Sequence, residues 1–130
     1  MKVIVAGGRD LTDRKLVYNS LDRLFRDFDD EYGMPIAGIE IVSGTARGAD
    51  RLGEDWAIVN WIMFKQFPAD WDKYGKGAGY VRNEEMAIYA DVLVAFWDGR
   101  SRGTKHMIDL AHKHGLEVHV YRYEVTDEGS

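Results

Sequence analysis

Five short apolar runs, separated by stretches with helical periodicity, most constrain the fold of this chain. The first is KVIVAG over residues 2–7, and the most continuous is DVLVAFW over residues 91–97. The others lie within residues 38–44, 62–70 and 116–123. Short apolar runs that alternate with helical segments are typical of buried parallel strands. The sequence therefore predicts a mostly parallel sheet of about five strands.

Four segments between these runs carry apolar residues at helical spacing. The first is expected to run from Thr12 to about Gly33, because its apolar residues recur every three or four positions. Further helices are expected over residues 48–61, 80–90 and 104–114. This alternation predicts a single Rossmann-like, three-layer α/β/α domain with helices on both faces of the sheet.

The chain has 130 residues, 45% of them hydrophobic and 30% charged, which suits one globular domain. We expect that domain to cover residues 1–123, and residues 124–130 to form an acidic flexible tail. There is no cysteine, which excludes disulfides and zinc–thiolate sites. The apolar run near residue 2 is too short for a signal peptide or a membrane span, so we expect a cytoplasmic protein without a membrane partner.

The formal net charge is −5 at pH 7. Non-specific binding to DNA needs a large basic surface, so this charge argues against nucleic acid as a partner. The spacing of the four histidines relative to carboxylates is not that of a metal site. We therefore expect no metal and no required cofactor.

Three loops that follow predicted strands are rich in glycine and arginine. In parallel α/β sheets ligands bind beyond the carboxyl ends of the strands, and the helix after each loop offers free backbone N–H groups there. Glycine lets these amides approach an anion, and arginine binds phosphate through two parallel hydrogen bonds. The loops therefore predict a site for a phosphorylated ligand. Its expected binding residues are Gly7, Gly8, Arg9 and Asp10, then Ser43, Gly44, Arg47 and Gly48, then Gly99, Ser101, Arg102, Gly103 and Thr104.

Aromatic residues suggest two further contacts. Trp71 opens a glycine-rich segment over residues 71–80 and is a candidate to stack on a base. The alternative is that Trp71 packs against the domain or a second subunit. Trp56 and Trp61, with the apolar residues between them, give the second helix more than one apolar face. We therefore expect a homo-oligomer, most simply a dimer.

Four motifs carry a resemblance to a known family. AGGRD, VSGTARGADRLGEDWA, FPADWDKYGKGAGYVRNEEM and DVLVAFWDGRSRGTKHMI closely resemble the YspA-like branch of the SLOG superfamily, in the expected order from Lys2 to about Tyr121. That superfamily also contains DNA-processing DprA/Smf domains and LOG nucleoside-monophosphate phosphoribohydrolases. The resemblance implies a Rossmann-like sheet that binds a nucleotide or a nucleotide-derived ligand, with Ser43 and Gly44 on its phosphate or ribose.

The resemblance to LOG enzymes is incomplete. Those enzymes cleave the bond between base and ribose 5′-monophosphate, using a Pro-Gly-Gly-x-Gly-Thr-x-x-Glu loop and an arginine on the preceding helix. Here Arg82 and Asn83 match the arginine region, and Gly103-Thr104 matches the Gly-Thr of the loop. The place of the glutamate falls on Met107, which cannot transfer a proton.

A carboxylate elsewhere would have to replace that glutamate. Besides Arg82, the catalytic candidates are Asp50 and Glu84, with Asp10 and Asp98 as further carboxylates. Asp50 orienting Arg47, or capping its own helix, is an equally open alternative.

Three functions follow from these expectations. The first is binding of a nucleotide or nucleotide-derived ligand, in a sensing, sequestering or processing role. The alternative is a LOG-like N-glycosidase that lacks the usual glutamate. The second alternative is an accessory protein of DNA processing that, like DprA, binds single-stranded DNA.

Overall fold

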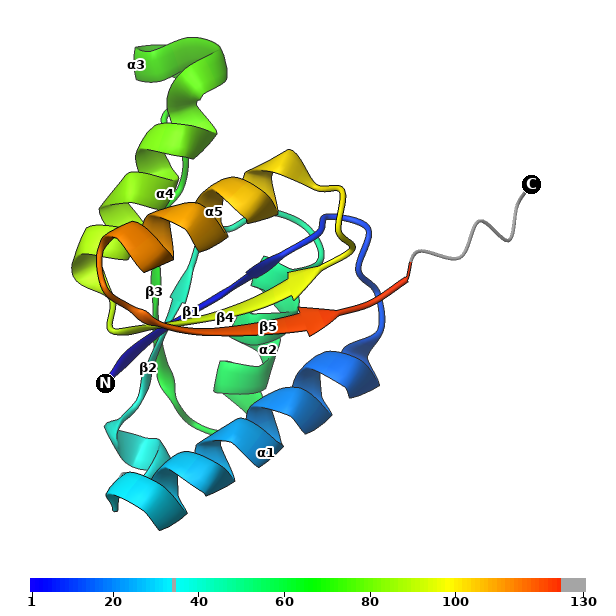
Figure 1. The fold of residues 1–130 in the computed structure, drawn as a ribbon, viewed down its shortest axis with the longest axis vertical. Helices are drawn as coiled ribbons and strands as arrows, with labels where there is room; N and C mark the ends of the chain where they lie inside the picture. Colours follow the sequence, from blue (N-terminus) through cyan, green and yellow to red (C-terminus); the bar gives the residue numbers. More distant parts are fainter. Residues whose placement is uncertain (34, 125–130) are drawn as a thin grey trace.

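The computed structural model describes residues 1–33 and 35–124, which form one sheet between two layers of helices (Figure 1). The strand order is β3-β2-β1-β4-β5, and all neighbouring strands are parallel. The predicted Rossmann-like α/β/α fold is therefore confirmed. Residues 125–130 of the expected tail lie outside the described residues, so the domain boundary stays a prediction.

The elements alternate as the sequence predicts. The strands are β1 (Lys2–Gly7), β2 (Glu40–Ser43), β3 (Met63–Gln66), β4 (Val92–Trp97) and β5 (Glu117–Arg122). The helices are α1 (Arg14–Tyr32), α2 (Ala49–Val59), α3 (Trp71–Tyr74), α4 (Ala78–Tyr89) and α5 (Arg102–Lys113), with short 3-10 turns η1 (Ile36–Gly38) and η2 (Gly75–Gly77).

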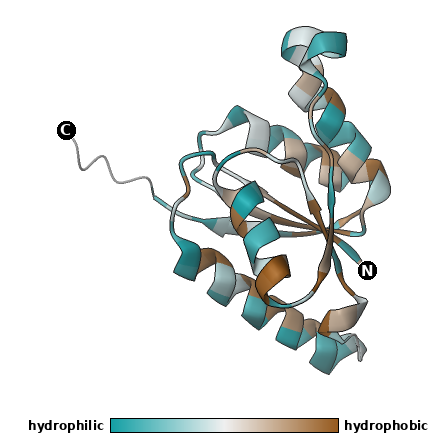
Figure 2. Ribbon diagram, turned by 180° about the vertical axis from the view of Figure 1, so that it is seen from behind, coloured by the Kyte–Doolittle hydropathy of each residue, from teal (hydrophilic) through white to brown (hydrophobic). Residues whose placement is uncertain are grey.

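Two cores lie on opposite faces of the sheet, because successive strand residues point to opposite sides. Val3 and Val5 of β1 pack with α1 and α2, whereas Ile4 and Ala6 pack with α4 and α5. Strand β4 alternates in the same way and is buried on both faces. Apolar colour accordingly follows the strands through the middle of the molecule, while the helices carry mixed polarity (Figure 2). This packing fixes the position of the carboxyl ends of the strands, from which the loops after β1, β2 and β4 emerge.

The glycine-rich segment after β3, which lies outside the predicted helices, contains a short helix. Residues 71–74 form the short helix α3, because the side chain of Asp70 caps its start by accepting a hydrogen bond from the amide of Lys73 at 3.0 Å. Turn η2 follows, and α4 begins at Ala78 rather than at Tyr80. The α3 and η2 segment projects beyond the sheet from the start of α4 (Figure 1).

The apolar residues of α2 and of the turn that follows it separate into two groups. Trp56 is fully buried and its indole donates a hydrogen bond to Asp22 at 2.9 Å. Ile58, Val59 and Trp61 are 59%, 63% and 95% exposed. These exposed apolar side chains could form a contact between subunits, so the expected self-association stays a prediction. Within residues 1–33 and 35–124, no helix is long and apolar enough to cross a membrane.

Candidate functional site

A cavity of about 590 Å³ opens at the carboxyl edge of the sheet. The loops after β1, β2 and β4 form one side of it, and α3, η2 and α4 form the other. Most of the predicted binding residues line it, namely Gly7, Gly8, Arg9, Asp10, Arg47, Asp50, Trp71, Arg82, Asn83, Ser101, Gly103 and Thr104. Loops far apart in the sequence thus meet in one place.

Basic side chains outnumber carboxylates around this cavity. Arg9, Arg47, Arg82, Arg100 and Lys76 line it, against three aspartates. Among the described residues, none of these five cations forms an ion pair within 4.0 Å. Unpaired arginines gathered in one cavity are suited to phosphate, because the guanidinium offers several donors in a planar fork.

Arg82 is held in place from several sides. One terminal nitrogen, Nη1, donates to the carbonyl oxygen of Gly44, and Nε donates to Oδ1 of Asn83 at 3.0 Å. The Asn83 amide in turn donates to the carbonyl oxygen of Gly103 at 3.4 Å. Arg82 on α4 is therefore tied to the loop after β2 and to the start of α5, and it presents a fixed cation to the cavity.

Asp50 is a buried carboxyl group on the cavity wall, only 5% exposed. Its Oδ2 accepts a hydrogen bond from the amide of Ala46 at 3.2 Å. Within the described residues Oδ1 makes no hydrogen bond, and Asp50 lines the cavity. Burial raises the pKa of Asp50 to about 7. The nearby Glu54 also raises this pKa, whereas the hydrogen bond from the Ala46 amide and the charge of Arg82 lower it.

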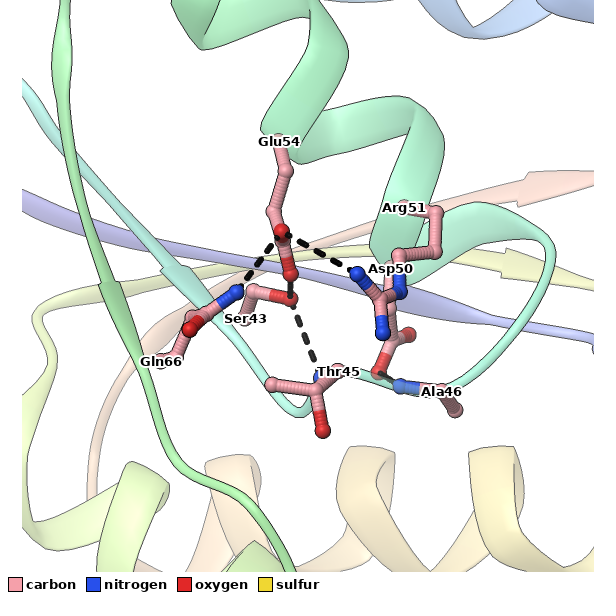
Figure 3. A network of polar contacts seen from close by, with 7 residues as sticks. All are labelled: Ser43, Thr45, Ala46, Asp50, Arg51, Glu54 and Gln66. Carbon is pink, nitrogen blue, oxygen red and sulfur yellow. Dashed lines mark hydrogen bonds and ion pairs between the residues drawn. The ribbon is translucent and has the colours of Figure 1, made fainter.

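A buried network supports the loop after β2 (Figure 3). The Ser43 hydroxyl donates to Oε2 of Glu54 at 2.5 Å, and the Gln66 amide donates to Oε1 at 3.0 Å. Ser43 Oγ also accepts the amide of Thr45 at 3.1 Å. Thr45 has a φ of 66°, which is uncommon for a β-branched residue and is kept only where the surroundings enforce it. Glu54 therefore joins β2, β3 and α2 beneath a strained loop.

Gly48 brings the first two loops together. Its φ is 79°, and a Cβ atom there would lie 2.2 Å from the carbonyl oxygen of Gly8. The same carbonyl accepts the amide of Ala49 at 3.2 Å and that of Leu11 at 3.3 Å. Glycine is required at position 48 by both backbone conformation and space.

The third loop caps α5 and orders its own backbone. Asp98 Oδ1 accepts the amides of Ser101 and Arg100, each at 2.8 Å, and these bonds lower the pKa of the Asp98 carboxyl. Ser101 caps the helix by accepting the amide of Thr104 at 3.4 Å. The start of α5 at Gly103 and Thr104 faces the cavity with its partial positive charge.

Several predicted residues do not line this cavity. Ser43 is fully buried in the Glu54 network. Gly44 contributes only its carbonyl oxygen, which accepts a hydrogen bond from Arg82. Glu84 contacts His114 at 3.1 Å on the far side of α4 instead. Arg102 is exposed outside the cavity, and Gly99 lines a neighbouring one. Of the two carboxylates predicted beside Arg82, only Asp50 reaches the cavity.

Tyr80, Met86 and Glu54 were missed by the sequence prediction. Tyr80 and Met86 stand three residues before and after Asn83, so helical spacing alone places them on its side of α4. Glu54 follows Asp50 by four residues, and the same spacing puts both carboxylates on one face of α2.

A five-stranded parallel sheet with a cavity where its central strands end defines a Rossmann-like α/β domain with a candidate ligand site. Residues 1–74 match the YspA, cpYpsA-related SLOG family. The chain belongs to this family, as its motifs predict. It is also similar to the Gene 61 protein of Mycobacterium phage D29, with 39% identity over 126 residues that covers 90% of this chain and 93% of that protein.

Two solved structures share the fold. DNA processing protein A (DprA) of Streptococcus pneumoniae gives a TM-score of 0.70 at 18% identity, covering 97% of this chain and 52% of that one. This chain thus spans about half the length of the pneumococcal protein. DprA of Helicobacter pylori gives a TM-score of 0.60 at 19% identity, covering 97% of this chain and 67% of that one.

The Helicobacter structure corrects one expectation. The Helicobacter protein binds single-stranded DNA in a unique mode. The prediction that nucleic acid is an unlikely partner, made from a net charge of −5, is therefore contradicted, because a protein of this fold binds single-stranded DNA. Net charge describes the whole surface of a protein, whereas a DNA strand contacts only part of that surface. In this acidic protein the residues around the cavity are predominantly basic.

Proposed function

We propose that this protein binds a nucleotide or nucleotide-derived ligand in the cavity at the carboxyl edge of its sheet. The observation that carries the proposal is the group of four arginines, Arg9, Arg47, Arg82 and Arg100, around one cavity and without ion-pair partners among the described residues. Phosphate supplies the charge that such a group lacks. The volume of about 590 Å³ lies in the range of small-molecule sites.

The opposite wall offers surfaces for a base. Trp71 and Tyr80 line the cavity and remain 54% and 49% exposed, so both rings are accessible. An aromatic ring beside a phosphate site favours a ligand with a planar group. In the proposed complex the phosphate contacts the arginines and the first turn of α5, and the base contacts Trp71.

The test is a melting-temperature series with AMP, ADP, ADP-ribose and oligothymidine. A ligand at about one hundred times its dissociation constant stabilises the native state by about 2.7 kcal/mol, which is readily measured for a domain of this size. Arg82→Gln is expected to abolish the shift, and Arg26→Gln on the exposed face of α1 is the matched control. A well-folded protein whose melting temperature no member of the series changes contradicts the proposal.

Asp50 supports hydrolysis of an N-glycosidic bond as a second candidate function. Asp50 lines the cavity together with Arg82, and the reacting ribose would lie beside them. In the proposed step water adds to C1′ as the C1′–N bond breaks, Asp50 accepts the proton of water, and that proton passes to the leaving base. Met107 lines the same cavity in the place of the LOG glutamate, so the carboxylate would come from α2 instead of α5.

Release of free base from nucleoside monophosphates tests this second candidate. Wild-type protein is expected to release base, and Asp50→Asn to bind the nucleotide without releasing any. Full recovery of intact nucleotide after long incubation, under conditions where it binds, rules out the hydrolase and leaves the binding function standing.

Single-stranded DNA is a third candidate ligand for the first cavity. It repeats phosphate and base along its length, and these are the groups that the arginines and aromatic rings of the cavity suit. The oligothymidine arm of the melting series detects it. An increase that appears with oligothymidine and not with AMP, and that falls steeply with added salt, favours the role in DNA processing over binding of a small molecule.

A further inference from the structure

A second cavity of about 820 Å³ lies beside the first, where β4 and β5 end. Asp10, Asp98 and Arg100 line both cavities, so the two adjoin at the loops after β1 and β4. Arg122 and Tyr123, at the end of β5, line only the second. A mononucleotide in the first cavity would leave this adjoining space unfilled.

The second cavity differs in charge from the first. Asp10, Asp98 and Glu124 give it three carboxylates against two arginines, whereas cations predominate in the first. Carboxylates repel a further phosphate, and they are the usual acceptors for the hydroxyl groups of ribose. The second cavity therefore suits a sugar with free hydroxyls better than a second phosphate.

Arg122 provides a flat cationic surface in this cavity. Its guanidinium lies 5.3 Å from the centre of the Trp97 ring and covers Gly99, where a Cβ atom would lie 2.3 Å from Nη2. No carboxylate lies within 4.0 Å of it in the part of the chain that the structure describes. A guanidinium stacked on one side in this way can accept a planar ring on the other.

Tyr123 lines the second cavity, and its hydroxyl is buried. It packs against Gly8, at the position where a Cβ atom of that residue would be, and Gly8 lines the first cavity. Among the described residues, it is the one buried side-chain polar atom without a hydrogen-bond partner. A buried hydroxyl without a hydrogen-bond partner is costly, so a ligand group or a water molecule that reaches it on binding would stabilise the complex.

We propose that the ligand has two parts, a nucleotide in the first cavity and a ribose-bearing unit, joined to it through phosphate, in the second. This inference rests on the proposed nucleotide-binding function and adds the class of ligand. Two sources share the required chemistry: a pyrophosphate-linked molecule such as ADP-ribose, and a diribonucleotide linked by a phosphodiester.

Isothermal titration with AMP, ADP-ribose and the diribonucleotide pApA tests the proposal. Wild-type protein is expected to bind at least one two-part ligand about tenfold or more tightly than AMP, a difference of about 1.4 kcal/mol. Arg122→Gln is expected to remove that gain and to leave the affinity for AMP within about twofold. Tyr123→Phe, which removes only the unpartnered hydroxyl, is expected to reduce the gain without lowering the melting temperature. The control is Arg23→Gln on α1, which changes neither affinity.

The outcomes separate this inference from the proposed function. Equal affinity of wild-type protein for AMP and for both two-part ligands overturns the inference and leaves nucleotide binding standing. An equal loss for AMP and the two-part ligand in Arg122→Gln also overturns it. Absence of binding to all three ligands overturns both proposals. A gain for ADP-ribose alone, or for pApA alone, supports the inference and identifies which linkage the protein accepts.

Discussion

Asp50 and Arg82 converge on one point beside Gly44, where a Cβ atom would lie 2.9 Å from Asp50 Oδ2 and 2.7 Å from Arg82 Nη1. The absence of a side chain at Gly44 lets the buried carboxyl of α2 and the cation of α4 approach the same backbone. Arg82 uses this space to bond the carbonyl oxygen of Gly44. The cavity wall therefore depends on a glycine that does not itself line the cavity.

Gly44→Ala is expected to destabilise the protein by about 1–3 kcal/mol, because the added methyl group must displace Arg82 or Asp50. The measurement is the free energy of unfolding in urea. Gly103→Ala is the control, since nothing lies within 4 Å of a Cβ atom there and alanine is favoured in a helix. Wild-type stability of Gly44→Ala would show that the contact is not constrained.

Asp50→Asn is expected to change how stability depends on pH. Burial raises the pKa of Asp50 from 3.8 to about 7, so between these values the native state holds a proton that the unfolded chain releases. The contribution of this carboxyl to stability therefore falls as pH rises from 4 to 7. The variant, which has no such group, should exceed wild-type stability at pH 8 by up to about 4 kcal/mol, and the excess should shrink toward pH 4. A difference that stays constant from pH 4 to pH 8 contradicts this assignment.

Glu54→Ala is expected to cost about 1–3 kcal/mol of unfolding free energy, because it leaves the buried Ser43 hydroxyl without its acceptor. Glu54→Gln retains an acceptor oxygen and should cost less. Asp55→Ala on the same helix is the control, since it breaks only an exposed pair with Arg14 and should cost under about 1 kcal/mol. Equal losses for Glu54→Ala and Asp55→Ala would mean that the network does not support the loop.

Arg47→Gln and Arg102→Gln form a matched pair for ligand binding. Both side chains are exposed, but only Arg47 lines the cavity. Loss of one charge-assisted contact should weaken nucleotide binding about tenfold in Arg47→Gln, whereas Arg102→Gln should stay within about twofold. Titration calorimetry gives both affinities, and melting temperatures near that of the wild type confirm folding. A larger effect at Arg102 would mean that the ligand lies outside this cavity.

Much of the fold follows from local sequence signals. The continuous apolar run over residues 91–97 predicts a buried strand, and β4 (Val92–Trp97) is an interior strand between β1 and β5. The helical structure of residues 71–77 was not predicted from the sequence. Its start depends on a single side-chain cap, that of Asp70, in a stretch rich in glycine. The order of the strands was not predicted either, since it depends on contacts between residues far apart in the chain.

Part of the candidate site also follows from local sequence patterns, and part of it depends on packing. Glycine and arginine after three strands predict that the loops meet, because the carboxyl ends of parallel strands share one edge. That Glu84 points to His114 and Asp50 to the cavity depends on how α4 and α2 are rotated in the packed domain. The Glu54 network needs β2, β3 and α2 in place before its members meet. Such relations arise from packing, which local sequence patterns do not specify.

The most direct test of nucleotide binding is an amide-resolved NMR titration of the full chain with AMP and ADP-ribose. Binding in the first cavity predicts that the amides of residues 7–10, 44–48 and 101–104 shift together and with one dissociation constant. Shifts confined to another surface, such as the exposed turn at residues 58–63, or no shifts with either nucleotide, would contradict the central claim.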